Sequence, residues 1–198
     1  MKKNKITKFI FTKFLLMNLC IFLLINLSYA GENIPVHFTG VKPTTSWCVY
    51  AGKVYINGKQ AVDNEDELGV FVKDNNGNLI LAGSCILGQI VSDHFFLNIY
   101  GDDTTTNYKD GAVNNDKLIF KIWDSSDKKE YHVLNSSLKT STDNDLTIPL
   151  IPPIWQNNKD FGLLIINYKN IVGDINLNSK IDMVDVQILL NKLVKNTE

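Results

Sequence analysis

Apolar and polar residues alternate over several short stretches between residues 31 and 168. Leu68, Val70 and Val72 fall on one side of such a stretch, and residues 118–123 repeat the pattern. A period of two is typical of a β-strand with one buried face. Stretches rich in aromatic and β-branched residues predict eight strands, at 34–39, 47–56, 68–73, 78–86, 94–100, 117–123, 130–134 and 163–168.

Turn-forming residues separate nearly all of these stretches. Asn76-Gly77 tolerates the positive φ angles of a tight turn, so residues 68–86 are predicted to form one hairpin. The prolines in residues 148–153 lack the N–H that a central strand needs, which makes this segment a crossing or an edge. No helical period occurs among the strands, and a mainly β fold, a β-sandwich over residues 31–169, is expected.

Residues 1–30 have the pattern of a signal peptide. Five lysines precede an apolar run over residues 14–27, and the small residues Ser28 and Ala30 occupy the positions that a signal peptidase reads. The mature chain is then expected to begin at Gly31. A lipoprotein anchor at Cys20 and a retained membrane anchor are the alternatives.

The charged residues of the chain argue against nucleic-acid binding. All 20 basic residues are lysine, and the predicted leader holds five of them and none of the 21 acidic residues, which leaves 15 against 21. Recognition of bases and phosphates relies on the planar fork of arginine, so an acidic chain without arginine is a poor nucleic-acid binder. Nucleic acid is therefore excluded as an expected partner.

Two cysteines, Cys48 and Cys85, follow the predicted leader. Export to an oxidising compartment would permit a disulfide between them, which would stabilise the domain by about 3 to 5 kcal/mol. Two buried free thiols are the alternative, because cysteine is a small apolar residue that packs well.

The C-terminal segment carries the strongest chemical pattern. Side-chain oxygens recur at positions 1, 3, 5, 9 and 12 of a twelve-residue loop, namely Asp174, Asn176, Asn178, Asp182 and Asp185. The backbone carbonyl of Lys180 stands at position 7, and this spacing matches an EF-hand-like calcium loop. The apolar residues Val186, Leu189, Leu190 and Leu193 then predict one C-terminal helix. A turn rich in Asp and Asn that only caps this helix is the alternative.

Residues 173–193 resemble one repeat of a type I dockerin, a calcium-folded module that docks secreted polysaccharide-degrading proteins onto cohesin-bearing scaffolds. The resemblance implies Ca²⁺ held by Asp174, Asn176, Asn178, Asp182, Asp185 and the Lys180 carbonyl. It also implies a cohesin-like partner. Ser179 replaces the usual glycine, Met183 and Val184 occupy the recognition positions, and a second repeat is missing upstream. Self-association through the C-terminal helix is therefore a further expectation for residues 170–198.

The strands around Trp47 and in residues 66–72, 96–100 and 118–124 are loosely similar to a β-sandwich repeat of bacterial secreted and surface proteins. That resemblance implies a non-catalytic module in a secreted or cell-surface protein.

Carboxylates and histidines are the candidate catalytic residues of this chain. Glycoside hydrolysis needs two carboxylates in a cleft, and the candidates are Asp63, Glu65, Asp66, Glu67, Asp102, Asp103 and Asp124. Acidic loop residues more often solvate a surface. The histidines His37, His94 and His132 lie in separate predicted strands, and no nucleophile elbow accompanies them. The protein is expected not to be an enzyme.

Exposed aromatic rings would suit a polysaccharide, because a flat apolar ring stacks on the C–H face of a sugar. The available residues are Trp47, Trp123, Trp155, Tyr50, Tyr100 and Tyr108. Most are expected to pack in the core, and Tyr108, in the polar loop 101–111, is expected to be exposed. Asp102, Asp103 and Asp110 in this loop offer a weaker second calcium pattern, for which an ordinary solvated loop is the favoured interpretation.

These patterns together predict a secreted, non-catalytic protein in which a β-sandwich binding or adhesion module is joined to a calcium-binding repeat used for assembly or attachment. After removal of the leader, no membrane partner is expected. The alternative is a carbohydrate-active component of a polysaccharide-degrading system, either a binding module or a minor hydrolase.

Overall fold

The computed structural model of the protein describes residues 34–141, 147–170, 173–176 and 180–195, with the side chain of Leu193 excepted. The predicted leader and Cys20 lie outside the described residues. Spatial proximity divides the chain into two units, residues 1–33 and 34–198, and all the elements below belong to the second.

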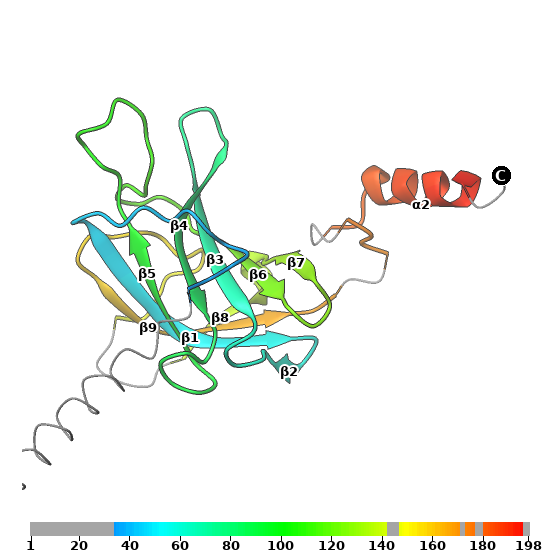
Figure 1. Ribbon diagram of the computed structural model, residues 1–198, viewed down its shortest axis with the longest axis horizontal. Coiled ribbons are helices and arrows are strands. Elements are labelled where there is room, and N and C mark those ends of the chain that lie inside the picture. Colours follow the sequence, from blue (N-terminus) through cyan, green and yellow to red (C-terminus); the bar gives the residue numbers. More distant parts are fainter. Residues whose placement is uncertain (1–33, 142–146, 171–172, 177–179, 196–198) are drawn as a thin grey trace, which may run out of the picture. The chain divides into compact units, whose positions relative to one another are not determined.

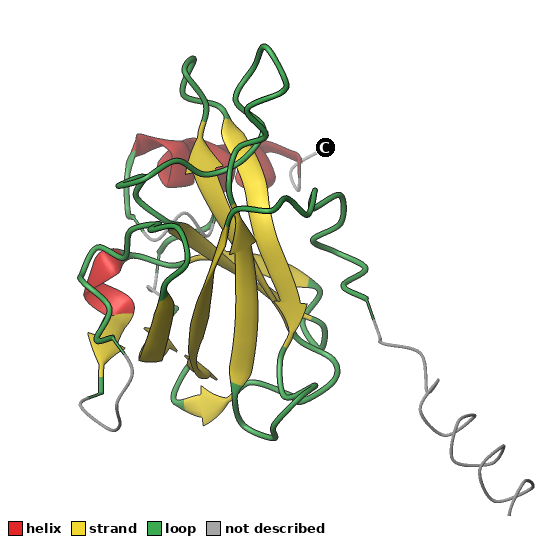
Figure 2. Cartoon of the chain, turned by 90° about the vertical axis from the view of Figure 1, so that its left-hand side faces the viewer, coloured by secondary structure: helices red, strands yellow, loops and turns green. Residues whose placement is uncertain are grey.

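The described chain is mainly β, with two sheets and one α-helix (Figure 1). The first sheet contains β1 (Trp47–Ile56), β2 (Lys59–Gln60), β5 (Phe95–Tyr100), β8 (Leu138–Thr140) and β9 (Asp160–Tyr168). The second contains β3 (Glu67–Lys73), β4 (Leu79–Ile86), β6 (Ile119–Asp124) and β7 (Lys129–His132), in the order β4-β3-β6-β7. A 3-10 helix, η1 (Asn135–Ser137), leads directly into β8 (Figure 2), and the α-helix α2 (Met183–Lys195) lies near the end of the chain.

The two sheets share one hydrophobic core. Val54, Leu97 and Leu164 of the first sheet and Val70 and Phe120 of the second are at most 1% exposed and belong to the same cluster. These are the inward positions of the alternating pattern. Their outward neighbours are at least partly exposed in β5 and β6, whereas in β3 the outward Gly69 is buried. The prediction of a mainly β fold is confirmed.

β9 pairs in parallel with β1, from Val49 opposite Asp160 to Ile56 opposite Tyr168. The register shifts between Tyr50 and Gly52, where the two backbones approach closely. A Cβ at Gly52 would lie 1.8 Å from the carbonyl oxygen of Leu164, so only glycine fits. This pairing places Tyr168 at the end of the first sheet, immediately before the predicted calcium loop.

Most predicted strands are found within one to three residues of their predicted ends, and residues 47–56 match β1 at both ends. The predicted hairpin is formed by β3 and β4, with Lys73 opposite Leu79. Residues 148–153 contain no strand, as their prolines predict. β2 and β8 were not predicted, because two or three residues are too few to show a period.

The predicted strand at residues 34–39 is wrong. This segment runs without a strand ladder as an N-terminal strap, residues 34–40, over the second sheet. Its backbone N–H groups at Val36, His37 and Phe38 donate to the buried carboxylate of Glu67 at 2.7 to 3.1 Å. A side chain therefore takes the place of a partner strand.

Two rings of the strap pack on the second sheet. Phe38 is 4% exposed and covers Gly69, where a Cβ would lie 2.7 Å from the Phe38 ring. His37 stacks on Trp123 with 3.8 Å between ring centroids, and its Nε2 lies 3.0 Å from Oε2 of Glu130. Glycine at position 69 thus makes room for the strap.

Glu130 links the strap to the sheet electrostatically. Its other carboxylate oxygen accepts a hydrogen bond of 2.8 Å from Nζ of Lys121. Burial alone would raise the pKa of Glu130, but the hydrogen bonds from Lys121 and His37 outweigh it and lower the pKa below its ordinary value. Glu130 is therefore ionised at neutral pH.

Cys48 of β1 and Cys85 of β4 are buried free thiols. Burial raises the pKa of each thiol to about 12, so neither is ionised at neutral pH. The structure thus realises the second of the two predicted alternatives for these residues.

We predict that Glu67→Gln destabilises the protein by about 1–3 kcal/mol, because an amide cannot accept from three strap N–H groups as a carboxylate does. Urea unfolding measures the change, and amide exchange at Val36 to Phe38 shows whether the strap is released. Glu65→Gln, at the exposed neighbouring position, is the matched control and should change neither value. Equal stability of the Glu67→Gln variant and the wild type would contradict the assigned role.

Candidate calcium loop

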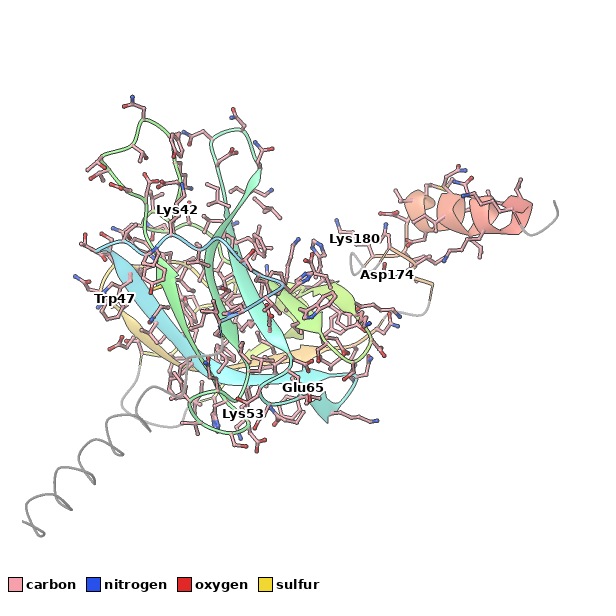
Figure 3. The ribbon with its side chains drawn as sticks, viewed as in Figure 1. Lys42, Trp47, Lys53, Glu65, Asp174 and Lys180 are labelled. Atoms are coloured by element: carbon pink, nitrogen blue, oxygen red, sulfur yellow. The ribbon has the colours of Figure 1, made fainter. Side chains whose placement is uncertain are left out.

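The predicted ligands lie on the segment that leads from β9 to α2, where Figure 3 labels Asp174 and Lys180, and in the first turn of α2, which contains Asp185. Five of the six are described, while Asn178 lies outside the described residues together with Ser179. Asp174 and Asp185 are buried at 4% and 2% exposure, whereas Asp182 and Lys180 are exposed. Two carboxylates from opposite ends of the twelve-residue loop are thus withdrawn from solvent.

Asp185 ties the start of the loop to the start of α2. Its Oδ1 accepts hydrogen bonds from the N–H groups of Ile175 and Asn176 at 2.7 and 3.1 Å, and its Oδ2 accepts from the N–H of Asp182 at 2.9 Å. The hydrogen bond from Asp182, followed by those from Asn176 and Ile175, lowers the pKa of Asp185 against the opposing effect of desolvation. The loop is therefore closed by a charged group at position 12.

Asp182 caps the helix. Its Oδ1 accepts from the N–H of Val184 at 2.9 Å, and its carbonyl oxygen accepts from the N–H of Asp185 at 3.2 Å. An aspartate here satisfies donors that the first turn of a helix leaves free. Helix capping, the alternative reading of this pattern, is thus one of the roles that Asp182 fills.

Asp174 has an electrostatic influence on two residues of the two-sheet domain. Burial raises the pKa of Tyr168 on β9, and the charge of Asp174 adds to this shift; the same charge counteracts the lowering of the His132 pKa, which is caused chiefly by burial and by Lys121. Over the described ranges, no three His, Cys, Asp or Glu residues gather as metal ligands would.

The apolar residues of α2 are exposed. Val186, Leu189 and Leu190, termed here the apolar face of α2, are 43, 49 and 50% exposed, and Met183 at the helix start is 77% exposed. Three such residues on one short helix are more than a solvated helix needs.

Several carboxylates that are candidates for glycoside hydrolysis accept hydrogen bonds that support the fold. Asp66 is 1% exposed and accepts hydrogen bonds from Val62 and Ser125, and Glu67 holds the strap. Asp63 accepts from Ser92 and from the backbone of Asp93. Asp124 accepts from the N–H groups of residues 126 and 127. Each carboxylate named here supports a turn or a segment of backbone.

Loop 101–111 brings its aspartates together around its own backbone. Oδ1 of Asp102 accepts from the N–H of Asp110, and Oδ1 of Asp110 accepts from the N–H of Asp103. Asp103 also accepts from Thr105, which lowers the pKa of its carboxyl. These contacts fit the favoured interpretation of an ordinary structured loop.

Two of the three histidines lie near the same carboxylate, that of Glu130. His37 and His132 approach the carboxylate of Glu130 at 3.0 and 3.9 Å, whereas Nδ1 of His94 lies 3.0 Å from the carbonyl oxygen of Ser92. The structure therefore does not bring the three histidines to one site.

Exposed aromatic residues form a row on the outer face of the first sheet. Trp47 is 39% exposed and lies directly opposite Tyr100, while Phe96 is also 39% exposed and lies opposite Ala51. Phe96 was not predicted, although the alternation of residues 95–100 places it outward with Tyr100. Tyr108 is 61% exposed as predicted, and Tyr50 and Trp155 are buried.

Comparison with protein-family models, curated proteins and solved structures finds no significant match. In the part of the chain that the structure describes, no helix has both the length and the apolar character needed to span a membrane.

We predict that the protein binds calcium and that Asp174→Asn lowers the affinity about tenfold or more, because an amide oxygen binds a hard cation less strongly than a carboxylate. Isothermal titration calorimetry in metal-free buffer measures this change. Asp160→Asn, an exposed aspartate at the start of β9, is the control and should bind as the wild type does. Equal heats of calcium binding by the wild type and Asp174→Asn would contradict the assignment of Asp174 as a calcium ligand.

Proposed function

We propose that the protein is a secreted, non-catalytic component in which a β-sandwich module, built from the two sheets, is joined to a dockerin-like calcium repeat that mediates assembly or attachment. The repeat comprises the loop from Asp174 to Asp185 and helix α2. Asp174, Asn176, Asn178, Asp182, Asp185 and the carbonyl of Lys180 hold the cation.

The buried carboxylate of Asp185 carries the proposal. It accepts hydrogen bonds from the N–H groups of Ile175, Asn176 and Asp182, so described residues from both ends of the loop meet at the position-12 carboxylate. A second buried carboxylate, Asp174, stands at position 1. Two buried carboxylates at the first and last positions of one loop are the type of ligand that a divalent cation prefers.

The apolar face of α2 supports assembly. Calcium would fix the loop and thereby the start of the helix, and the exposed side chains of Val186, Leu189 and Leu190 would then be presented in one orientation. The partner is a cohesin-like scaffold module or the same helix of a second copy. Burial of this face provides the hydrophobic part of the binding energy.

Two charges placed on the apolar face should abolish assembly. We expect the double variant Val186→Glu, Leu189→Glu to lose at least tenfold in affinity for the partner, because charged groups resist transfer from water into an apolar interface. Binding is measured in calcium buffer by biolayer interferometry, with a type I cohesin module and, separately, a second copy of the protein as the immobilised partner.

The double variant Gln187→Glu, Asn191→Glu is the matched control, because it adds the same charge to the same helix at two exposed polar positions. It should bind as the wild type does. If the wild type bound neither partner in calcium, the assembly function would be wrong.

A polysaccharide-binding module is the second candidate, and the aromatic row on the first sheet favours it. Trp47 and Tyr100 are adjacent across β1 and β5, and Phe96 lies four residues from Tyr100, roughly 13 Å along the strand. The exposed amide of Asn98 between them offers hydrogen bonds to sugar hydroxyls. Such a row would suit an extended glycan chain.

We predict that, if this second function holds, the protein is retained by at least one insoluble glycan and that Trp47→Ala weakens retention severalfold by removing a stacking surface. Co-sedimentation with a panel of cellulose, xylan, mannan and chitin measures the effect. Tyr108→Ala removes an exposed ring outside the row and should leave retention unchanged. Retention that survives both Trp47→Ala and Phe96→Ala would exclude this face as the binding site.

A further inference from the structure

A cavity opens at the end of the second sheet where β7 leaves β6. The N–H of Val133 still donates to the carbonyl oxygen of Phe120, but beyond it the chain turns into η1. Residues 153–155 take its place beside β6, since the N–H of Leu118 donates to the carbonyl oxygen of Pro153 at 2.9 Å. Residues of both segments, together with the start of β6, line a cavity of about 460 Å³.

The walls of this cavity are mainly apolar. They are formed by Leu118, Ile119, Val133, Leu134 and Pro152. Ile119 is half-buried and alternates with the buried Leu118 and Phe120, so the cavity opens on the outer face of the second sheet. Its size and its lining are those of a small-molecule site, in which apolar walls are combined with a few polar groups.

Two lysines, Lys73 at the end of β3 and Lys117 just before β6, also line the cavity. Phe71 lies opposite Ile119 in the ladder between these strands, and continuation of this register places Lys73 opposite Lys117. Like charges directly opposite each other on neighbouring strands repel. Among the residues that the structure describes, neither ammonium group forms an ion pair. An anion between the two lysines would offset their repulsion.

The carboxylate of Asp116 lines the cavity as well, but it is already bound. Its Oδ2 accepts from Nζ of Lys109 at 2.7 Å and from the N–H of Val113 at 2.8 Å. Nζ of Lys109 also donates to the carbonyl oxygen of Lys73 at 2.7 Å, which brings a third ammonium group to this place. Three positive charges therefore gather around one negative charge, and the polar side of the cavity favours an anionic ligand.

We propose that this cavity binds a small amphipathic carboxylate. Its apolar body packs between Ile119, Leu134 and Pro152, and its carboxylate lies between Lys73 and Lys117. The side-chain amide of Asn135, which lines the same cavity, is a further donor. The inference adds a ligand to the two-sheet domain and rests neither on the calcium loop nor on the aromatic row.

Octanoate tests the proposal, and octan-1-ol, which has the same chain without the charge, is the matched ligand. In isothermal titration calorimetry, octanoate should bind about tenfold more tightly than octan-1-ol, because only the acid can pair with the lysines. In the double variant Lys73→Glu, Lys117→Glu, the affinity for octanoate should fall about tenfold or more, since two carboxylates then face the ligand. The double variant Lys53→Glu, Lys59→Glu makes the same change of charge on the first sheet and should bind octanoate as the wild type does.

The position of the ligand distinguishes this cavity from other apolar surfaces. In an NMR titration, octanoate should shift the amide signals of Ile119 and Leu134 and leave those of Trp47 and of the apolar face of α2 unchanged. The proposal is overturned if octanoate does not bind, if octan-1-ol binds equally tightly, or if the Lys73→Glu, Lys117→Glu variant keeps the wild-type affinity. Shifts confined to α2 or to the aromatic row overturn it too. None of these results affects the calcium site or the glycan surface, whose residues are different.

Discussion

The parallel pairing of β1 with β9 is the constraint on which the remaining structure depends. β1 lies early in the domain and β9 ends it, and their pairing fixes where the chain leaves the first sheet. The close approach at Gly52 permits no side chain, so the register at this point is set by sterics as well as by hydrogen bonds. Tyr168 is thereby held at the end of the core, directly before the candidate calcium loop.

Buried carboxylates that accept backbone N–H groups are the recurring device of this protein. Glu67 holds the strap, Asp66 holds two turns, and Asp185 holds the two ends of the loop. In each case a carboxylate accepts the backbone N–H groups of a segment that has no partner strand or helix turn to accept them. The donors of irregular backbone are satisfied in this way. The charge remains tolerable because several donors converge on it.

The sequence predicted the regular parts of this fold well, because their side chains alternate with a period of two. β6 buries every second residue, and Leu68, Val70 and Val72 are the inward residues of β3, so the pattern and the structure have one cause. Residues 34–39 have the composition of a strand, but their N–H groups are satisfied by the distant Glu67, and no local pattern reveals a partner at a separation of about 30 residues. Composition alone therefore does not distinguish this strap from a strand.

The candidate site was predicted through spacing, since ligand positions in a loop are a local property. Asp174, Asp182 and Asp185 could be found in this way, and so could the capping role of Asp182. The stacking of Tyr168 on Tyr131 next to this segment could not be predicted, because it depends on the pairing of distant strands. The exposure of Phe96 could have been predicted from the alternation of residues 95–100, but nothing in the sequence distinguishes Phe96 from the other aromatic residues.

The strap has a consequence for the order of events as the chain folds. Residues 34–40 are synthesised before the residues that hold them, which are Glu67, Trp123 and Glu130, and the last of these lies 93 residues after His37. The strap therefore cannot complete its contacts until the chain has been made as far as β7. Docking of the strap would thus be a late step of folding, although the strap lies early in the described chain.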